Sequence, residues 1–336
     1  MEQKDHRTAE EFGELIARTK TEIHKVIVGQ EALIDQVLQC IFCQNHALLM
    51  GVPGLAKTLL VTTVSQVIGI TSRRIQFTPD LMPSDITGTE VIQEDPETGR
   101  KHFLFVEGPV FANLILADEI NRAPAKTQAA LLEAMQERQV SAGKKKYVLP
   151  VPFFVLATQN PIEQEGTYNL PEAQLDRFMF LINVDYPETD EEIEVLRRTT
   201  TNYRDDPEQV MDGDKIIHYQ KVIRDVLVRD DIYDYVIRLV QATRVSKDYG
   251  LPYCKEWLAW GAGPRAGQNL LLGAKSRALF NGRSYITTSD VQAVAKPVMR
   301  HRIIANYAAV AEGITTDMVV DEIIESVSVP KETATV

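Results

Sequence analysis

Gly51-Val52-Pro53-Gly54-Leu55-Ala56-Lys57-Thr58 is the most informative segment of this sequence. An apolar run typical of a buried strand, residues 46–50, precedes it, and residues 59–68 follow with the apolar spacing of a helix. A glycine-rich loop between a strand and a helix is the pattern of a phosphate-binding loop. This position favours a nucleotide site over a turn that merely links the two elements.

The residue types in this loop suit triphosphate binding. Glycines let backbone N–H groups turn toward phosphate oxygens with no side chain in the way, and the helix N-terminus presents a positive dipole end to the same anion. Lys57 supplies a mobile charge for the β and γ phosphates of ATP, and Thr58 supplies a hydroxyl for Mg²⁺. The predicted nucleotide-binding residues of the loop are Gly51, Val52, Pro53, Gly54, Leu55, Ala56, Lys57, Thr58 and Leu59.

Ala56 is a departure from the usual signature, which has glycine at this position. Because Ala56 lies next to the predicted start of the helix, we expect its φ to be helical already. Alanine would then be tolerated without strain.

Short apolar runs alternating with helical stretches predict an α/β fold with a parallel sheet covered on both faces. Two inserts with strand-like segments around turn residues, at residues 87–106 and 139–149, predict β-hairpins. The second hairpin has Gly143 and three lysines at its tip. The predicted strands of the sheet are residues 46–50, 74–77, 114–117, 153–157 and 178–184.

The composition changes after Asp185 and predicts a second domain. Residues 186–214 are acidic and rich in turn residues, and three later segments carry apolar residues at helical spacing. We expect residues 1–186 to form the α/β core, with a helical N-terminal segment and the two hairpins, and residues 187–336 to form an acidic linker and a helical domain. The first dozen residues are polar and are expected to be loose. The three later helical segments are residues 231–243, 262–279 and 288–302.

Composition excludes several classes of protein. Hydrophobic residues make up 44% and charged residues 25% of the 336 residues, as in ordinary globular proteins. No apolar run approaches the roughly 20 residues needed to span a bilayer, and residues 1–12 lack the apolar region of a secretory signal. The net charge of −11 opposes non-specific binding to nucleic acids. We therefore expect a cytoplasmic protein with no membrane insertion, and three cysteines are too few for a disulfide framework.

A second acidic motif supports the nucleotide site. The apolar residues 114–117 run directly into Asp118 and Glu119. A buried strand would hold Asp118 at the carboxyl edge of the sheet, where open α/β sheets bind ligands. There Asp118 can orient the shell of Mg²⁺, and Glu119 can polarise the attacking water. A strand that ends in a solvated acidic turn is the alternative, which the upstream phosphate loop disfavours.

Further motifs resemble the AAA+ ATPases of the MoxR family, in the helix-2-insert branch. The resemblance implies a P-loop AAA+ core with a five-stranded parallel sheet, followed by a C-terminal all-helical lid domain. It also implies that the two hairpins are the inserts of this branch. The motifs are Asp118-Glu119-Ile120-Asn121-Arg122-Ala123-Pro124, residues 128–136 (QAALLEAMQ), Ala157-Thr158-Gln159-Asn160-Pro161, residues 170–178 (LPEAQLDRF) and Gly261-Ala262-Gly263-Pro264-Arg265-Ala266.

The resemblance implies further site residues. Asn160 matches sensor 1, where a neutral amide can hold the water or the γ-phosphate; an ordinary Asn-Pro turn is the alternative. Arg265 matches sensor 2, although Gly263 replaces the serine usual in this family, a cap weaker by a few tenths of a kcal/mol. Residues 27–30 match the segment that borders the adenine, and ordinary core packing is the alternative for Ile27 and Val28.

Arg177 matches the arginine finger that one subunit presents to the γ-phosphate of its neighbour, an effect of about 10³–10⁵ in rate. A surface pair between Asp176 and Arg177 is the alternative, and Arg122 is a second candidate that could equally brace the acidic turn. The implied catalytic residues are Glu119, Asn160, Arg177 and Arg265, with Thr58 and Asp118 at the metal.

The activity implied by the resemblance is Mg²⁺-dependent ATP hydrolysis. It would drive the chaperone-like remodelling or maturation of a protein client by a homo-oligomer, a hexameric ring. Proteins of this family typically work with a von Willebrand factor A-domain partner. In similar ring ATPases the hairpins face the pore or the client, so the lysines at 144–146 could meet an acidic partner or simply be solvated.

Other activities on the same scaffold are less favoured. A nucleic-acid motor or loader is the alternative function, and the absence of a basic stripe counts against it. An ATP-binding scaffold without turnover is disfavoured because the motif residues are all present. A GTPase would need an NKxD-type segment, which the sequence lacks.

Overall fold

The computed structural model describes residues 2–52, 54–94, 99–143, 145–162, 166–202, 205–246 and 248–330. Pro53 of the phosphate loop and Lys144 of the second hairpin lie outside these residues. The chain divides into two compact units. The core unit comprises Arg18–Arg177 and Ile182–Ile217, and the lid unit comprises Met1–Ala17, Phe178–Leu181 and His218–Val336.

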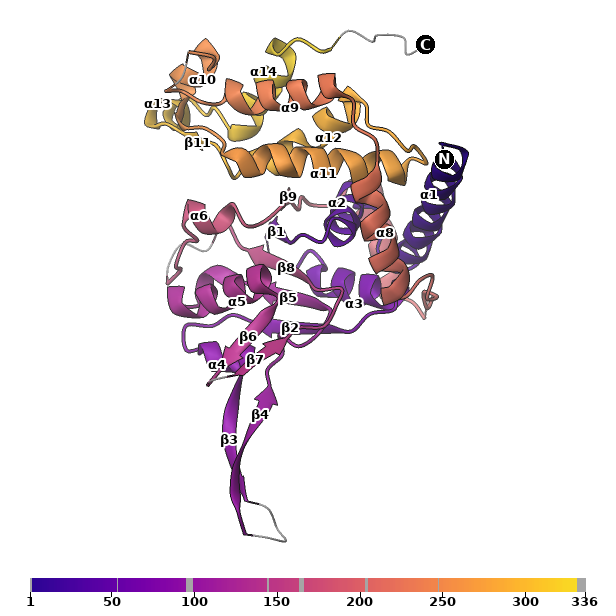
Figure 1. Cartoon of the computed structure of the whole chain (residues 1–336), viewed down its shortest axis with the longest axis vertical. Helices are drawn as coiled ribbons and strands as arrows, with labels where there is room; N and C mark the ends of the chain where they lie inside the picture. The colour runs from indigo at the N-terminus through magenta and orange to yellow at the C-terminus, as the bar shows by residue number, and fades with distance from the viewer. Residues whose placement is uncertain are drawn as a thin grey trace. The chain divides into compact units, whose positions relative to one another are not determined.

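A five-stranded sheet carries the order β2-β5-β8-β1-β9, which confirms the five predicted strands (Figure 1). The pairs β2·β5, β5·β8 and β8·β1 are parallel. Because β8 lies between β5 and β1, the residues that follow these three strands meet at one edge of the sheet. The strands are β1 (Ala47–Met50), β2 (Ser72–Gln76), β5 (Leu114–Asp118), β8 (Phe154–Gln159) and β9 (Phe180–Asn183).

The central strands form because their side chains are apolar and buried on both faces. In β5, Leu114 to Ala117 are at most 1% exposed. Helix α2 contacts β8, and α3 contacts β2 and β5. The helices of the core unit include α2 (Glu31–Phe42), α3 (Lys57–Val67), α4 (Pro83–Thr87), η1 (Ile120–Arg122), α5 (Ala125–Glu137), α6 (Glu172–Leu175) and α7 (Thr189–Thr199).

Two antiparallel hairpins stand where the sequence predicts them. β3 (Gly88–Glu94) pairs with β4 (Lys101–Glu107), and this hairpin extends away from the five-stranded sheet (Figure 1). β6 (Gln139–Ala142) pairs with β7 (Lys145–Val148). Phe105 of the first hairpin stacks on Tyr147 of the second, with ring centroids 3.9 Å apart. The bases of the two hairpins therefore support each other.

The lid unit is mainly helical. α11 packs on both α9 and α12, and these three helices match the three predicted C-terminal helices. A short antiparallel ladder, β10 (Leu258–Trp260) with β11 (Ile304–Ala305), is an addition to the predicted helices. The helices are α8 (Gly213–Asp225), which begins in the core unit, α9 (Asp230–Ala242), α10 (Pro252–Trp257), α11 (Pro264–Phe280), α12 (Thr288–Met299), α13 (Tyr307–Ala311) and α14 (Thr316–Ser326).

The prediction that the first dozen residues are loose is wrong, because helix α1 spans Glu2–His24. Ala9 and Phe12 are fully buried, and the Phe12 ring stacks on Tyr219 of α8 at 4.2 Å between centroids. Burial of this apolar face stabilises α1 as an amphipathic helix, and the helix continues through the polar residues at its start.

Part of the segment predicted as a turn-rich linker is also helical, since it contains α7. Glu188 and Glu191 form a capping box at its start, and Arg198 pairs with Glu194 at 2.8 Å one turn away. These local contacts offset the polarity of the segment. The domain boundary at residues 186 and 187 stays a prediction. None of the helices in the described ranges is both long and apolar enough to cross a membrane.

Candidate functional site

A cavity of about 490 Å³ lies in the core unit. It is formed by the phosphate loop, the first turn of α3, and residues at the ends of β5 and β8. A volume of this size is typical of small-molecule sites. The described residues that line it are Gly54, Leu55, Ala56, Lys57, Thr58, Leu59, Arg74, Asp118, Glu119, Thr158 and Asn160.

The phosphate loop has the open backbone that the sequence predicts at Gly54. This residue has a φ of +90°, and a Cβ added there would have no atom within 4 Å. Gly51 is needed for a different reason, since its Cβ would lie 2.7 Å from the carbonyl oxygen of Val184. The first glycine therefore allows close packing, and the second leaves the backbone accessible from the cavity.

The expectation for Ala56 is wrong. Its φ is +53° and its ψ is +23°, which is the left-handed region. Residues with a Cβ are strained there by roughly 1–2 kcal/mol, whereas glycine is not. The turn into α3 therefore requires a left-handed residue, which explains why glycine is usual at this position.

Lys57 is the first residue of α3, and its Nζ donates a 2.6 Å hydrogen bond to the carbonyl oxygen of Gly51. Burial lowers the pKa of Lys57 from its ordinary value, whereas the charges of Asp118 and Glu119 raise it. The ammonium group is thus held at the mouth of the loop by a backbone acceptor, close to two carboxylates.

Asp118 ends β5 and sits in a dense set of hydrogen bonds. Its Oδ1 accepts from the hydroxyl of Thr158 at 2.7 Å, and that hydroxyl oxygen accepts the backbone N–H of Glu119 at 2.8 Å. Its Oδ2 accepts from Nε and an Nη of Arg74 at 3.1 and 2.6 Å. The carboxylate is therefore fixed on one side by the neighbouring strand β8 and faces a cation on the other.

Glu119 follows directly, with a left-handed φ of +56°. Its Oε2 accepts a 2.9 Å hydrogen bond from Gln76 and lies 3.3 Å from an Nη of Arg122. A backbone conformation of this kind for a non-glycine residue costs about 1–3 kcal/mol and clusters at functional sites. The side chain is held by Gln76 and Arg122 of its own chain.

Asn160 follows β8, between the ends of β5 and β1, as the sequence reasoning expects. The residue is 7% exposed and lines the cavity. Its Oδ1 accepts the backbone N–H of Ile162 at 3.1 Å. This turn fixes the carbonyl oxygen of the side chain and leaves the amide as the group that can donate toward a ligand.

Arg74, Gln76 and Thr158 are site residues that the sequence reasoning missed. Arg74 and Gln76 lie two residues apart in β2, so both point to the same side of the strand. The register pairs Gln76 with Asp118. Polar residues at alternate positions of a predicted sheet strand beside the acidic strand are the signal that could have found them.

The other predicted site residues lie apart from the described lining of the cavity. Ile27 is 3% exposed. Gly29, two residues later, packs closely on α7, because a Cβ added there would lie 2.0 Å from Oε1 of Glu191. The contact of Ile27 and Val28 with adenine stays a prediction. Val52 is half-buried in the loop after β1.

The two remaining arginines stand in different units. Arg177 is half-buried in the core unit, where one Nη donates a 3.2 Å hydrogen bond to the carbonyl oxygen of Leu132 in α5. Arg265 is exposed in the first turn of α11 in the lid unit. The roles of both stay predictions.

The donor set fits a nucleoside triphosphate with Mg²⁺. The open backbone at Gly54, the ammonium of Lys57 and the N-terminus of α3 suit phosphate oxygens. Within the described ranges, no group of three or more His, Cys, Asp or Glu side chains could hold a metal ion. Mg²⁺ usually takes one or two carboxylates together with substrate phosphates and water. Thr58 and Asp118 could complete such a shell with phosphate oxygens.

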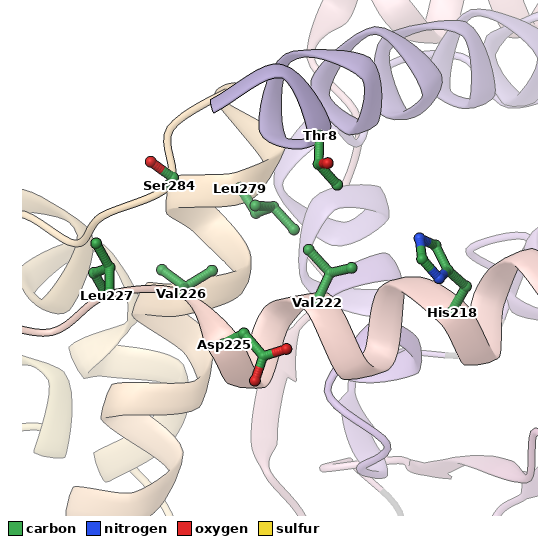
Figure 2. Close-up of a pocket in the computed structure, with 8 residues that line it drawn as sticks. All are labelled: Thr8, His218, Val222, Asp225, Val226, Leu227, Leu279 and Ser284. Atoms are coloured by element: carbon green, nitrogen blue, oxygen red, sulfur yellow. The ribbon is translucent and has the colours of Figure 1, made fainter. Parts of the chain in front are cut away.

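A smaller cavity, about 230 Å³, lies within the lid unit. In Figure 2, Thr8 of α1, Val222 of α8 and Leu279 of α11 point toward one another in this pocket. Of its described lining residues, His218 and Asp225 carry the titratable groups. Its mainly apolar lining does not suit a triphosphate.

Two family models match the chain. Residues 46–180 match the ATPase family associated with various cellular activities (AAA), and residues 253–323 match the AAA lid domain. A crystal structure of a proposed ATPase from Cytophaga hutchinsonii is similar, with a TM-score of 0.89 and 44% identity, over 97% of this chain and 98% of that chain.

Curated relatives extend this similarity along the sequence. Chaperone MoxR1 of Mycobacterium tuberculosis is 44% identical over 319 residues, 95% of this chain and 83% of that protein. The protein YeaC of Bacillus subtilis is 37% identical, over 97% of this chain and 98% of that protein. Protein MoxR of Paracoccus denitrificans is 31% identical, over 84% of this chain and 86% of that protein. Identity of this extent, over a shared AAA domain and lid, means that the chain is an ATPase and belongs to the MoxR family of AAA+ proteins.

Proposed function

We propose that this ATPase uses Mg²⁺ and ATP to remodel or mature a protein client in a chaperone-like manner, as a ring of identical subunits. One observation carries the catalytic part of the proposal. One cavity is lined by side chains from three places in the chain: Lys57 after the phosphate loop, Asp118 and Glu119 at the end of β5, and Asn160 after β8. These are the groups that phosphoryl transfer to water requires.

Each residue has a distinct part in the proposed reaction. The backbone of residues 51–56 and the ammonium of Lys57 bind the phosphates, and the hydroxyl of Thr58 and the carboxylate of Asp118 hold Mg²⁺. When bound, Mg²⁺ neutralises charge on the phosphate oxygens. Glu119 orients and polarises the attacking water, and Asn160 donates to that water or to the γ-phosphate. Adenine contact by Ile27 and Val28 belongs to the same proposal.

Arg177 is our proposed trans-acting arginine, and Arg265 is our proposed sensor 2. Arg122 is less suited to act across an interface because it lies 3.3 Å from Glu119 of its own chain. The hydrogen bond from Arg177 to Leu132 is to a backbone carbonyl, and a half-buried guanidinium can exchange this acceptor for a phosphate. An isolated subunit should then hydrolyse ATP slowly.

The chaperone role rests on the similarity to Chaperone MoxR1. A hexameric ring, a von Willebrand factor A-domain partner and a cytoplasmic location are parts of the proposal that rest on the family resemblance. The division into a core of residues 1–186 and a lid region of residues 187–336 is also part of the proposal, and it rests on the change of composition after Asp185. The projecting β3–β4 hairpin and the lysines of the β6–β7 hairpin are the surfaces that we assign to the client.

The test uses the Glu119→Gln variant, which should bind ATP and retain it. The variant is immobilised with ATP, with ADP, or without nucleotide, and proteins that remain attached are identified. Lys57→Ala is the matched control, because it should lose nucleotide and therefore its client. Proteins held only by Glu119→Gln with ATP support the proposal.

Equal binding in all nucleotide states and by both variants would contradict a nucleotide-driven client cycle. Retention of DNA or RNA instead, with a steep dependence on salt, would favour the alternative of a nucleic-acid motor.

A further inference from the structure

Three consecutive basic residues at the end of α12 hold one short segment of backbone. Arg300, His301 and Arg302 contact the carbonyl oxygens of Phe178, Met179 and Leu181, and both segments belong to the lid unit. We call residues 300–302 the carbonyl clamp. The segment that it holds begins directly after Arg177.

Arg302 makes the largest share of these contacts. Its two Nη atoms donate to the carbonyl oxygens of Met179 at 3.1 Å and Phe178 at 2.5 Å, and one of them also donates to that of Val298 in α12. Its guanidinium therefore ties the last turn of α12 to two consecutive carbonyls of the held segment. A planar fork of donors suits such an arrangement, and a lysine could not reproduce it.

The other two residues of the clamp add contacts to the same segment. Nε2 of His301 lies 3.1 Å from the same Phe178 oxygen. Burial and the neighbouring charge of Arg302 lower the pKa of His301 well below its ordinary value, so the ring is neutral. A neutral ring can contribute to this contact only with its proton on Nε2, because a carbonyl oxygen accepts. Arg300 donates to the Leu181 oxygen at 3.3 Å and pairs with Asp317 of α14 at 2.9 Å.

The held segment has little freedom of its own. Phe178, Met179 and Phe180 are completely buried. On the α11 side, a Cβ added to Gly273 would lie 3.2 Å from the ring of Phe180, so that helix packs closely on the segment. Phe180 and Leu181 also belong to β9 of the five-stranded sheet, so the sheet, the packing against α11 and the clamp together restrict the backbone of this segment.

Stability alone is a weak reason for such a clamp. Arg302 is 6% exposed and His301 is 8% exposed. Burial of a cation costs several kcal/mol, and apolar residues of similar volume often stabilise a protein as well or better. A buried guanidinium bonded to main-chain oxygens does, however, define the position of those oxygens sharply. The geometry points to a positional role.

We propose that the carbonyl clamp positions Arg177 for its action on the nucleotide of a neighbouring subunit. Arg177 is joined to Phe178 by one peptide bond, so the direction of its side chain depends on the segment that the clamp holds. This inference rests on the proposed trans-acting role of Arg177, and Arg300, His301 and Arg302 are positioning residues in it.

The test measures ATP hydrolysis in mixtures of two variants. Arg177→Ala subunits keep an intact cavity but lack the arginine, and Glu119→Gln subunits keep the arginine but cannot activate water. Each variant alone is expected to be nearly inactive, and the mixture should recover activity at interfaces where the two kinds of subunit meet. If no mixture recovers activity, the trans-acting role in the proposed function fails, independently of the clamp.

Arg302→Lys is then added to one kind of subunit at a time. In the Glu119→Gln subunit it should reduce the recovered rate at least about tenfold, since a displacement of about 1 Å can cost 10²-fold. In the Arg177→Ala subunit it should leave the recovered rate within about twofold, because that subunit donates no arginine. This asymmetry is a readout that a general loss of stability would not produce.

The matched control is Arg283→Lys, which breaks a bidentate pair with Asp290 at 2.7 and 2.8 Å in the same unit, away from residues 178–181. It should not reproduce the asymmetry. Arg300→Lys is a second variant that tests the clamp if Arg302→Lys does not fold, with a smaller loss expected. Equal effects of Arg302→Lys in both kinds of subunit, no effect in either, or the same asymmetry for Arg283→Lys would overturn the inference.

Discussion

Charged side chains have different kinds of partner in the cavity of the core unit and in the clamp of the lid unit. At the cavity, Arg74 pairs with Asp118 and Arg122 pairs with Glu119, and these arginine side chains are 50% and 42% exposed. In the clamp, Arg302 is 6% exposed and donates to main-chain carbonyl oxygens. At the cavity the arginines pair with side-chain carboxylates, and in the clamp the charged side chains bond to backbone oxygens.

The difference follows from what each region must do. Solvent screens an ion pair whose arginine is about half exposed, so phosphate can replace the carboxylate, or a metal the arginine, at lower cost than in a buried pair. Removing one partner from a buried, bonded charge costs about 3–5 kcal/mol, and a carbonyl oxygen cannot rotate away from its chain. The charges at the cavity can therefore exchange partners with a ligand, whereas those of the clamp hold a segment in place.

Glu119→Gln should produce the largest effect at the cavity. The carboxylate is needed to polarise water, so kcat should fall by about 10²–10⁴, while the affinity for ATP stays within a few-fold. Steady-state hydrolysis and equilibrium binding of a labelled ATP check the two parts. If turnover persists undiminished, Glu119 does not activate water. Loss of ATP binding would instead mean that its pairs with Gln76 and Arg122 are structural, as in the clamp.

His46 extends the comparison into the core unit, because its ring is also bonded to backbone. Nε2 lies 3.2 Å from the carbonyl oxygen of Met135, and Nδ1 accepts the backbone N–H of Val155 at 3.0 Å. Burial lowers the pKa of His46 from 6.5 to about 4. At these pH values the unfolded chain binds a proton at His46 that the folded chain does not bind. Because of this difference, the free energy of unfolding should fall by about 3 kcal/mol as the pH falls from 6.5 to 4.

The measurement for His46 is the free energy of unfolding in urea at several pH values. The wild type should lose stability as the pH falls through this window, and His46→Gln should show a shallower slope. Above pH 6.5 the contribution of His46 should be flat. Identical slopes for the two proteins below pH 6.5 would show that the ring is protonated in the folded state, and that its backbone bonds do not hold it neutral.

Lys57→Ala tests whether the cavity charges serve the ligand more than the fold. Removal of the ammonium should weaken ATP binding roughly 10- to 100-fold, since a hydrogen bond to a charged group contributes about 1.5–3 kcal/mol. The free energy of unfolding without nucleotide should change by less than about 1 kcal/mol. Unchanged affinity for ATP would remove the phosphate-loop role. A large loss of stability would mean that Lys57 holds the fold together, as the buried charges of the clamp do, more than it binds the ligand.

Ala56→Gly should have the smallest effect. It relieves a left-handed alanine, worth roughly 1–2 kcal/mol, and loses about 0.4–1 kcal/mol through the greater freedom of glycine in the unfolded chain. A net gain in the free energy of unfolding of about 0.5–1 kcal/mol is expected. Gly54→Ala is the matched reverse change at a φ of +90°, and it should destabilise the protein. Stabilisation by Gly54→Ala would contradict strain as the cause.

Much of the fold and part of the site could be predicted because the signals are local. The apolar run before Gly51 and the helical spacing after Thr58 identify a strand, a loop and a helix within about twenty residues. The strand that ends in Asp118 carries its own signature. The alternate polar residues Arg74 and Gln76 are a weaker signal, because their importance depends on the pairing of β2 with β5 across a long separation in sequence.

The errors at Ala56 and at the N-terminus have the same origin. A left-handed φ at residue 56 is imposed by the entry of the loop into α3. The helical state of the residues before Glu10 depends on the burial of Phe12 against Tyr219, far along the chain. The spacing of residue types along a short stretch of sequence indicates neither of these constraints.

The sequence alone determined the family, the α/β class, the phosphate loop and the acidic strand, because each depends on residue types at fixed short spacing. Only the tertiary structure decided which polar and charged groups bond to each other: Arg74 with Asp118, Gln76 with Glu119, and the clamp with the segment after Arg177. The physical reason is that short-range patterns specify backbone conformation, whereas partners of buried and paired charges come from strands and helices that folding brings together.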